Sequence, residues 1–371
     1  MTISDVTATR REAERLSFLD QAGWPGCEIA PLAGDASTRS YFRIRRGDSQ
    51  ALLMDAPAGA EAPACPVGAS AEEREALGYN ATARLAGPNL AAFASLAEAL
   101  TQRGFSAPKI LAADLETGFL LLEDLGDQLF ARILPGDYHE GTLYAEAVDV
   151  LAALYRSSFP QVLEAHGAQW PLQSYDRLAL KAEADLFLEW YLGEHAKIEL
   201  SDVAKAEWDA IWSAQFDRLE NCPPGIVLRD YHAENLFFLE DRDGQARIGL
   251  IDFQDAVIGH PAYDLVSLLE DARRNVDRKL PSLLKARFVE QAGIEDAAGF
   301  DASYAVLGAQ RNAKILGIFV RLALRDGKAR YLGMLPHVAR LFVADLQHPA
   351  LMPLLNWAKA HAEPVFREAH K

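Results

Sequence analysis

The segment from residue 226 to residue 255 limits the fold of this chain more than any other stretch. Apolar runs at 226–228 and 236–239 flank a polar stretch that cannot continue either strand. Turn residues around Gly244 lead to a third apolar run at 248–253, which ends in acidic residues. The pattern predicts strand, loop, strand, turn and strand, in two tight hairpin-like units whose polar residues meet at the strand ends.

Three side chains of this segment have the chemistry of a phosphoryl-transfer site. Asp230 can accept or orient the proton of an acceptor hydroxyl, and Asn235 and Asp252 offer the oxygen ligands that Mg²⁺ prefers. A single D-x-x-x-x-N match is common by chance, and each acid alone could cap a turn or face solvent. The ordered set in its strand context nevertheless favours catalysis, with ATP as phosphoryl donor and Mg²⁺ as metal.

The sequences VLRDYHAENLFFL and GLIDFQDAVIGHPAYDLVSLL resemble the aminoglycoside phosphotransferase family of small-molecule kinases. GDASTRSYFRI, LLMDAP, FLLLEDLGD and GAQRNAKILGIFVRL resemble one bacterial branch, whose members phosphorylate the anomeric hydroxyl of cell-wall amino sugars. The likeness extends over about residues 32–341. It implies an ATP- and Mg²⁺-dependent phosphotransferase with an alcohol acceptor, N-acetylmuramate or N-acetylglucosamine, acting in peptidoglycan recycling.

The resemblance also implies an α+β, protein-kinase-like fold with two lobes. A small antiparallel β-sheet lobe would bind the nucleotide and span residues 1–126, ending in a hinge. A larger, mainly helical lobe over residues 127–371 would hold the catalytic loop and the acceptor site. Five apolar strands and one main helix, at 89–104, are expected in the first lobe, with the strands at 29–32, 41–45, 51–55, 108–113 and 118–122.

Composition narrows the function further. The net charge of −16 argues against nucleic acid or an anionic membrane as a partner. Cys27, Cys65 and Cys222 are scattered without metal-ligand spacing, and no apolar run suggests a signal peptide or a membrane span, so we expect a cytoplasmic protein. The connection from Asp252 to Asp264 is too short for a protein-kinase activation segment. ATP and a small sugar are the expected partners, and no protein partner is implied.

The phosphate-binding residues of the first lobe depart from the general kinase pattern. A polar turn offers Ser37, Thr38 and Arg39, whose hydroxyl and backbone groups could cover phosphates, although an ordinary hairpin turn is equally consistent with them. The third strand usually carries a lysine that contacts the phosphates, but Met54 stands at that position. Arg39 or Arg43 could supply the positive charge instead.

In the family, the hinge binds the adenine ring through main-chain groups. The resemblance therefore implies that Glu123 and Leu125 bind the nucleotide through their backbones rather than their side chains.

Five residues are candidates for contact with the acceptor, each with a structural alternative. His232 and Glu234 lie between Asp230 and Asn235 and could also be exposed loop residues. Asp255 could bind acceptor hydroxyls. Arg311 and Lys314 lie on a predicted helix, where they could bind a carboxylate or phosphate or form a solvated basic face.

Several tryptophan, tyrosine and phenylalanine residues of the second lobe suggest a sugar-stacking platform, but aromatics at helical spacing are more often core. Two other functions also remain open. One is a kinase for a different acceptor, such as an aminoglycoside, a choline-like amine or another sugar. The other is a nucleotide-binding module without turnover, which Met54 and Leu228 would permit because they replace a usual lysine and histidine.

Overall fold

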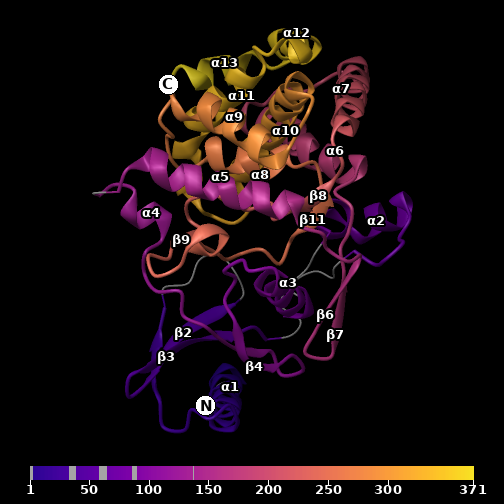
Figure 1. The fold of residues 1–371 in the computed structure, drawn as a ribbon. Coiled ribbons are helices and arrows are strands. Elements are labelled where there is room, and N and C mark those ends of the chain that lie inside the picture. The colour runs from indigo at the N-terminus through magenta and orange to yellow at the C-terminus, as the bar shows by residue number, and fades with distance from the viewer. Residues whose placement is uncertain (1–2, 33–38, 58–64, 86–89, 137) are drawn as a thin grey trace.

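The computed structural model describes residues 3–32, 39–57, 65–85, 90–136 and 138–371. A β-sheet and a larger helical part lie at opposite ends of the molecule. Residues 226–255, which we call the catalytic segment, lie between them (Figure 1). The antiparallel sheet has the strand order β1-β2-β3-β5-β4, which confirms the five predicted strands. The strands are β1 (Glu28–Pro31), β2 (Ser40–Arg46), β3 (Ser49–Asp55), β4 (Ile110–Asp114) and β5 (Phe119–Leu122).

Alternating side chains cover both faces of this sheet. Leu53 and Leu121 pair across β3 and β5 and pack with α1 (Ile3–Gln21), whereas the neighbouring pair Met54 and Leu120 packs on the side of α3 (Leu90–Gln102). Met54 is fully buried, so the third strand presents an apolar side chain to the core where a lysine would face phosphate.

A hairpin that we did not predict extends from the helical part toward the sheet. Strands β6 (Val162–Ala165) and β7 (Ala168–Pro171) pack against α3 (Figure 1). His166 and Gly167 at its tip have φ of +50° and +76°, the left-handed pair that a tight two-residue turn requires. Its strands are too short to give a periodic signal in the sequence.

The helical part is built around the long helix α10 (Ala297–Leu324), which packs on α6 (Arg177–Leu186), α8 (Ala262–Leu269) and α11 (Leu335–Asp345). Trp208 and Trp212 are fully buried, so these two side chains belong to the hydrophobic core and do not form a sugar-stacking platform. The remaining elements are α2 (Ala71–Leu77), η1 (Asn80–Arg84), α4 (Phe130–Ile133), α5 (Glu140–Arg156), η2 (Phe187–His195), α7 (Asp202–Phe216), η3 (Asp217–Asn221), η4 (Gly244–Arg247), α9 (Leu280–Ala292), η5 (Ala329–Met334), η6 (Pro349–Leu351), α12 (Met352–His361) and α13 (Glu363–Ala369).

The catalytic segment corrects one prediction. Strands β9 (Leu236–Phe238) and β10 (Ile248–Leu250) pair as expected, but β8 (Gly225–Val227) pairs with β11 (Val257–Gly259), a strand that we did not predict. The chain therefore leaves β8, passes through the β9–β10 pair and returns beside β8. The polar stretch after β8 is thus a loop that connects two small sheets. The prediction that the first two strands form a hairpin was wrong, because β8 does not pair with β9.

Candidate active site

The catalytic loop is held at its start by a carboxylate of α8. Asp264 accepts hydrogen bonds from the backbone N–H groups of Leu228 (2.6 Å) and Arg229 (2.8 Å). Arg229 has φ of +73°, which turns the chain sharply before Asp230. Burial raises the pKa of Asp264 to about 7, although both backbone donors act in the opposite direction. Asp264 therefore anchors the start of the loop.

The structure brings Asp230, Asn235 and Asp252 together. The side-chain amide of Asn235 donates to the backbone carbonyl of Asp230 (3.0 Å) and lies 3.5 Å from Oδ2 of Asp252. Gln254 donates to Oδ1 of Asp252 (2.7 Å), and Asp252 has φ of +59°. Residues from two loops are thereby held close together.

The two acidic side chains have different electrostatic surroundings. Burial works against ionisation of Asp230, but the nearby His232 ring and the positive charges of Lys314 and Arg229 lower its pKa below the usual value. Asp252 opens onto the cleft, yet loss of surrounding water and the charge of Asp230 raise its pKa to about 6. Two carboxylates kept close together, with an amide beside them, suit a divalent cation, because the cation would relieve their repulsion.

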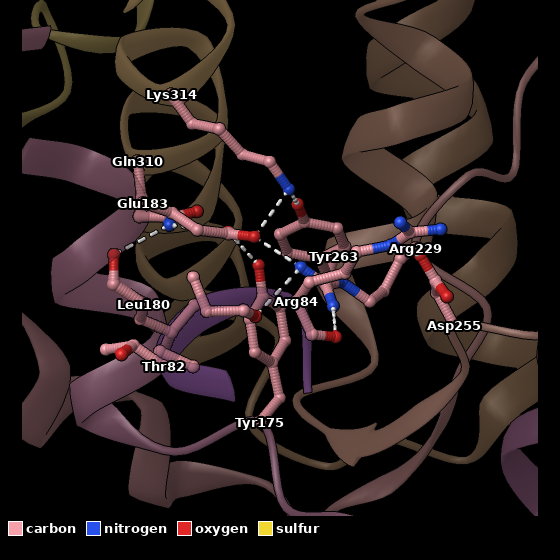
Figure 2. A network of polar contacts seen from close by, with 12 residues as sticks. Thr82, Arg84, Tyr175, Leu180, Glu183, Arg229, Asp255, Tyr263, Gln310 and Lys314 are labelled. Carbon is pink, nitrogen blue, oxygen red and sulfur yellow. Dashed lines mark hydrogen bonds and ion pairs between the residues drawn. The ribbon is translucent and has the colours of Figure 1, made fainter. Parts of the chain in front are cut away.

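A buried ionic network supports the loop from behind (Figure 2). Glu183 of α6 is completely buried and accepts hydrogen bonds from Arg229, Tyr175 and Gln310. Lys314 of α10 places Nζ 2.7 Å from the same carboxylate. Burial alone would raise the pKa of Glu183, but Lys314 and Arg229 lower it, so the carboxylate is ionised at neutral pH. The network fixes the guanidinium of the residue that precedes Asp230.

The same guanidinium ties the catalytic loop to η1. Arg229 donates to the backbone carbonyls of Arg84 (2.6 Å) and Ala83 (3.2 Å). The side chain of Arg84 in turn donates from Nε to Oδ2 of Asp255 (2.6 Å). Figure 2 shows Arg84 and Asp255 beside the Arg229–Glu183 pair. Because η1 precedes α3, this contact links the first lobe to the catalytic loop.

A cleft of about 500 Å³ lies between the sheet and the catalytic segment. Its apolar walls suit a flat aromatic ring, and they include Leu52, Leu122, Leu125, Phe237 and Ile251. Its polar end suits phosphates and a metal ion, and it includes Arg39, Arg84, Asn235, Asp252 and Gln254. Glu123 and Leu125 both line this cleft at the hinge, where sequence reasoning places them.

The nucleotide candidates separate into different places. Arg39 is buried and lines the cleft, whereas Arg43 bonds the hinge acids Asp124 (2.7 Å) and Asp127 (2.9 Å). Both of these contacts hold Arg43 at the hinge end of the sheet. Ser37 and Thr38 lie outside the described residues.

The acceptor candidates also separate. Lys314 is committed to Glu183, and Asp255 to Arg84. Glu234 is exposed and pairs with Arg273. His232 and Arg311 are buried beside Asp230. The structure therefore brings only part of the predicted acceptor set to the catalytic aspartate.

Sequence reasoning missed Arg84 and Glu183. Arg84 follows an irregular stretch and belongs to a short π-helical turn, which has no periodic signal. Glu183 lies on the buried face of α6, where an acidic residue at a core position is unusual and could have been noticed.

Together these features fit a two-lobed phosphotransferase in which Asp230, Asn235 and Asp252 lie beside a cleft between the sheet and the helical part. Comparison with known proteins agrees: the sequence profile of the phosphotransferase enzyme family matches residues 28–304. The chain belongs to this family. No helix within the described parts of the chain is long and apolar enough to cross a membrane.

The relatives resemble this chain over almost their whole length. A protein of Caulobacter vibrioides named N-acetylmuramate/N-acetylglucosamine kinase is 44% identical over 96% of this chain and 97% of its own. A protein of the same name from Pseudomonas aeruginosa is 33% identical over 90% of this chain and 89% of its own.

Solved structures show the same fold at low sequence identity. A choline/ethanolamine kinase family protein from Mesorhizobium loti matches with a TM-score of 0.55 and 17% identity, covering 95% of this chain and 99% of its own. A choline kinase from Streptococcus pneumoniae matches with a TM-score of 0.51 and 13% identity, covering 88% of this chain and 99% of its own. The predicted kinase-like α+β fold is confirmed.

Proposed function

We propose that this chain is an ATP- and Mg²⁺-dependent sugar kinase that phosphorylates the anomeric hydroxyl of N-acetylmuramate or N-acetylglucosamine. The observation that supports it most directly is the convergence of Asp230, Asn235 and Asp252, of which Asn235 and Asp252 line the polar end of the cleft. The names of the two relatives above support the acceptor. In bacteria, such a kinase would act on sugars released from peptidoglycan.

In this proposal the adenine ring lies against the apolar walls of the cleft, near the hinge, and the phosphates extend toward Asp252. Asn235 and Asp252 would hold Mg²⁺, since an amide oxygen and a carboxylate are ligands that this ion prefers. The ion would neutralise charge on the phosphates. Arg39 and Arg84 line the polar end and would supply the positive charge that Met54 cannot.

Asp230 would orient the sugar hydroxyl. The hydroxyl oxygen forms a bond to the γ-phosphorus, the bond from that phosphorus to the bridging oxygen of ATP breaks, and ADP leaves with the electron pair. The hydroxyl proton passes to Asp230. Because the pKa of Asp230 is lowered, its carboxylate is a weak base and contributes mainly by positioning, as expected for a loose phosphoryl-transfer transition state.

The test is ADP release in the presence of Mg²⁺ and ATP with a panel of acceptors: N-acetylmuramate, N-acetylglucosamine, glucose, kanamycin and choline. The expected result is turnover of the N-acetyl sugars, loss of the reducing end in the product, and loss of at least about a thousandfold in kcat for Asp230→Asn. Turnover of kanamycin or choline alone would overturn the sugar assignment. Absence of turnover with every acceptor would overturn the proposed function.

A further inference from the structure

Three buried polar atoms beside the catalytic loop have no hydrogen-bond partner among the residues that the structure describes. They are Nδ1 of His232, Nη1 of Arg311 and Oδ2 of Asp271. Their side chains are 3%, 4% and 1% exposed, respectively. Native proteins pair nearly all such buried groups, because an unpaired one loses its contact with water and gains nothing in return. Unmet donors and acceptors next to a catalytic residue indicate a ligand.

The three side chains converge on the catalytic loop from different elements. The segment after α8 lies on the loop: the backbone N–H of Arg273 donates to Oδ1 of Asp271 (2.9 Å), and its guanidinium lies 3.3 Å from Nε2 of His232. Arg311 reaches the underside of the loop from α10 and donates to Ser267 (2.8 Å). His232 and Arg311 both lie close enough to Asp230 to lower the pKa of its carboxylate.

The donor or acceptor character of each atom follows from its neighbours. A guanidinium can only donate, so Nε2 of His232 accepts from Arg273, and the ring proton is therefore on Nδ1. Burial and the charge of Arg273 lower the pKa of His232 to about 4, which keeps the ring neutral. The unpartnered atoms are thus two N–H donors, from His232 and Arg311, and one carboxylate acceptor, from Asp271.

An acetamido group is the complement of this set, since its carbonyl oxygen accepts two hydrogen bonds and its N–H donates one. In a 2-acetamido sugar this group is attached to the carbon next to the anomeric carbon. A sugar whose anomeric hydroxyl meets Asp230 would therefore carry its acetamido group into the same neighbourhood. A free amine at that position would be protonated, so it could pair with Asp271 but would offer no acceptor to His232 and Arg311.

We propose that His232, Arg311 and Asp271 form a recognition site for the 2-acetamido group of the acceptor. The inference rests on the proposed sugar-kinase function and names the residues that would select its substrate. Arg273 is a positioning residue in this arrangement, because it fixes the histidine tautomer and the Asp271 side chain without contacting the sugar.

The first test is Asp271→Asn, which keeps Oδ1 for Arg273 and turns the unpartnered oxygen into an N–H group. We expect kcat/KM for N-acetylglucosamine to fall by about tenfold to a hundredfold, because a donor would then face the amide N–H. The Kd of a non-hydrolysable ATP analogue with Mg²⁺ and the urea unfolding midpoint should not change. If Oδ2 only faces trapped water, the variant will keep kcat/KM within about threefold of the wild type and overturn the proposal.

A matched pair at His232 tests the donor. Asparagine places an N–H near the position of Nδ1, whereas glutamine places an acceptor near Nε2 and has no donor at Nδ1. His232→Gln should lose about tenfold or more in kcat/KM for N-acetylglucosamine, and His232→Asn should lose less. The reverse order would show that the Arg273 contact alone matters and would overturn the role of Nδ1.

The activity of the wild-type enzyme distinguishes failure of the recognition site from failure of the proposed function. If it phosphorylates N-acetylglucosamine but the Asp271 and His232 variants are unaffected, the recognition site is wrong and the proposed function stands. If it phosphorylates no N-acetyl sugar, both are overturned.

Discussion

Replacing Glu183 with glutamine tests whether the buried ionic network holds the catalytic loop in place. The substitution keeps the shape of the side chain but removes the charge that balances Arg229 and Lys314. At an effective dielectric constant of about 20, two unit charges separated by the 2.7 Å between Lys314 and Glu183 attract by roughly 6 kcal/mol. The amide oxygen of glutamine recovers part of this attraction, but the cations stay buried without a carboxylate.

We therefore expect Glu183→Gln to lower the free energy of unfolding by about 3–5 kcal/mol, the usual cost of breaking a buried ion pair from one side. The measurement is urea unfolding followed by circular dichroism at about pH 7–8. Glu183 has a lowered pKa in the folded state, so its contribution is complete above its unfolded pKa and is lost as the pH falls through the folded value. The loss in the variant should accordingly shrink in acid.

Two controls make the result specific. Asp149→Asn removes an exposed ion pair with Arg287 that has a similar distance of 2.6 Å, and it should cost less than about 1 kcal/mol. The double variant Glu183→Gln/Lys314→Met should be less destabilised than the sum of its single variants, by about 1–3 kcal/mol, because one unbalanced cation is gone. A loss below about 1 kcal/mol in Glu183→Gln would refute the reasoning.

Three further predictions concern the site itself. Asp264 has a folded pKa of about 7 against an ordinary value of 3.8, so its contribution to stability is complete below the unfolded value and is lost as the pH rises through the folded value. Asp264→Asn should remove this loss of up to roughly 4 kcal/mol, which falls between about pH 3 and pH 8, and equal pH slopes in urea unfolding would contradict this. Asp252→Asn should abolish the strengthening of ATP binding by Mg²⁺ in calorimetry while metal-free ATP still binds, and an unchanged response to Mg²⁺ would exclude Asp252 as a ligand. Arg84→Met should lower kcat by about a hundredfold, whereas Arg43→Met at the hinge should lower it by less than about tenfold in the same ADP-release assay.

The sequence was sufficient to predict the parts of the site that depend on local order along the chain. The spacing of Asp230, Asn235 and Asp252 between apolar runs placed all three at strand ends, and their convergence followed from the short connections. The five strands of the first lobe were predicted because apolar runs and turn residues alternate clearly there. Both sequence patterns depend on neighbouring residues, and the structure has the strands that they predict.

Contacts between distant segments could not be predicted in this way. The pairing of β8 with β11 joins two three-residue strands, each too short to have a periodic pattern. The role of Glu183 depends on neighbours far away in the chain, which no spacing reveals. Lys314 was a candidate for binding a carboxylate or phosphate of the sugar, with a solvated basic face as the alternative, whereas the structure pairs it with the buried carboxylate of Glu183.

The backbone at the site explains why the network is so extensive. Arg229 and Asp252 are both non-glycine residues with positive φ, at +73° and +59°. Such conformations cost of order 1 kcal/mol or more each and persist only where the surroundings fix them. Arg229 is fixed twice, by Asp264 at its backbone and by Glu183 at its side chain, whereas Asp252 is held by hydrogen bonds from Gln254 and Asn235.

The two sharp turns bring Asp230 and Asp252 close together, since an extended chain at either point would carry the carboxylates apart. Arg229 is a bulky residue in a backbone conformation that favours glycine. Glycine at this position would relieve the backbone strain but would remove the cation that contacts Glu183 and the backbone carbonyls of η1. The strain at Arg229 is therefore coupled to the charge of the network. A change that relaxes the turn must also release η1, and with it the Arg84 side chain at the polar end of the cleft.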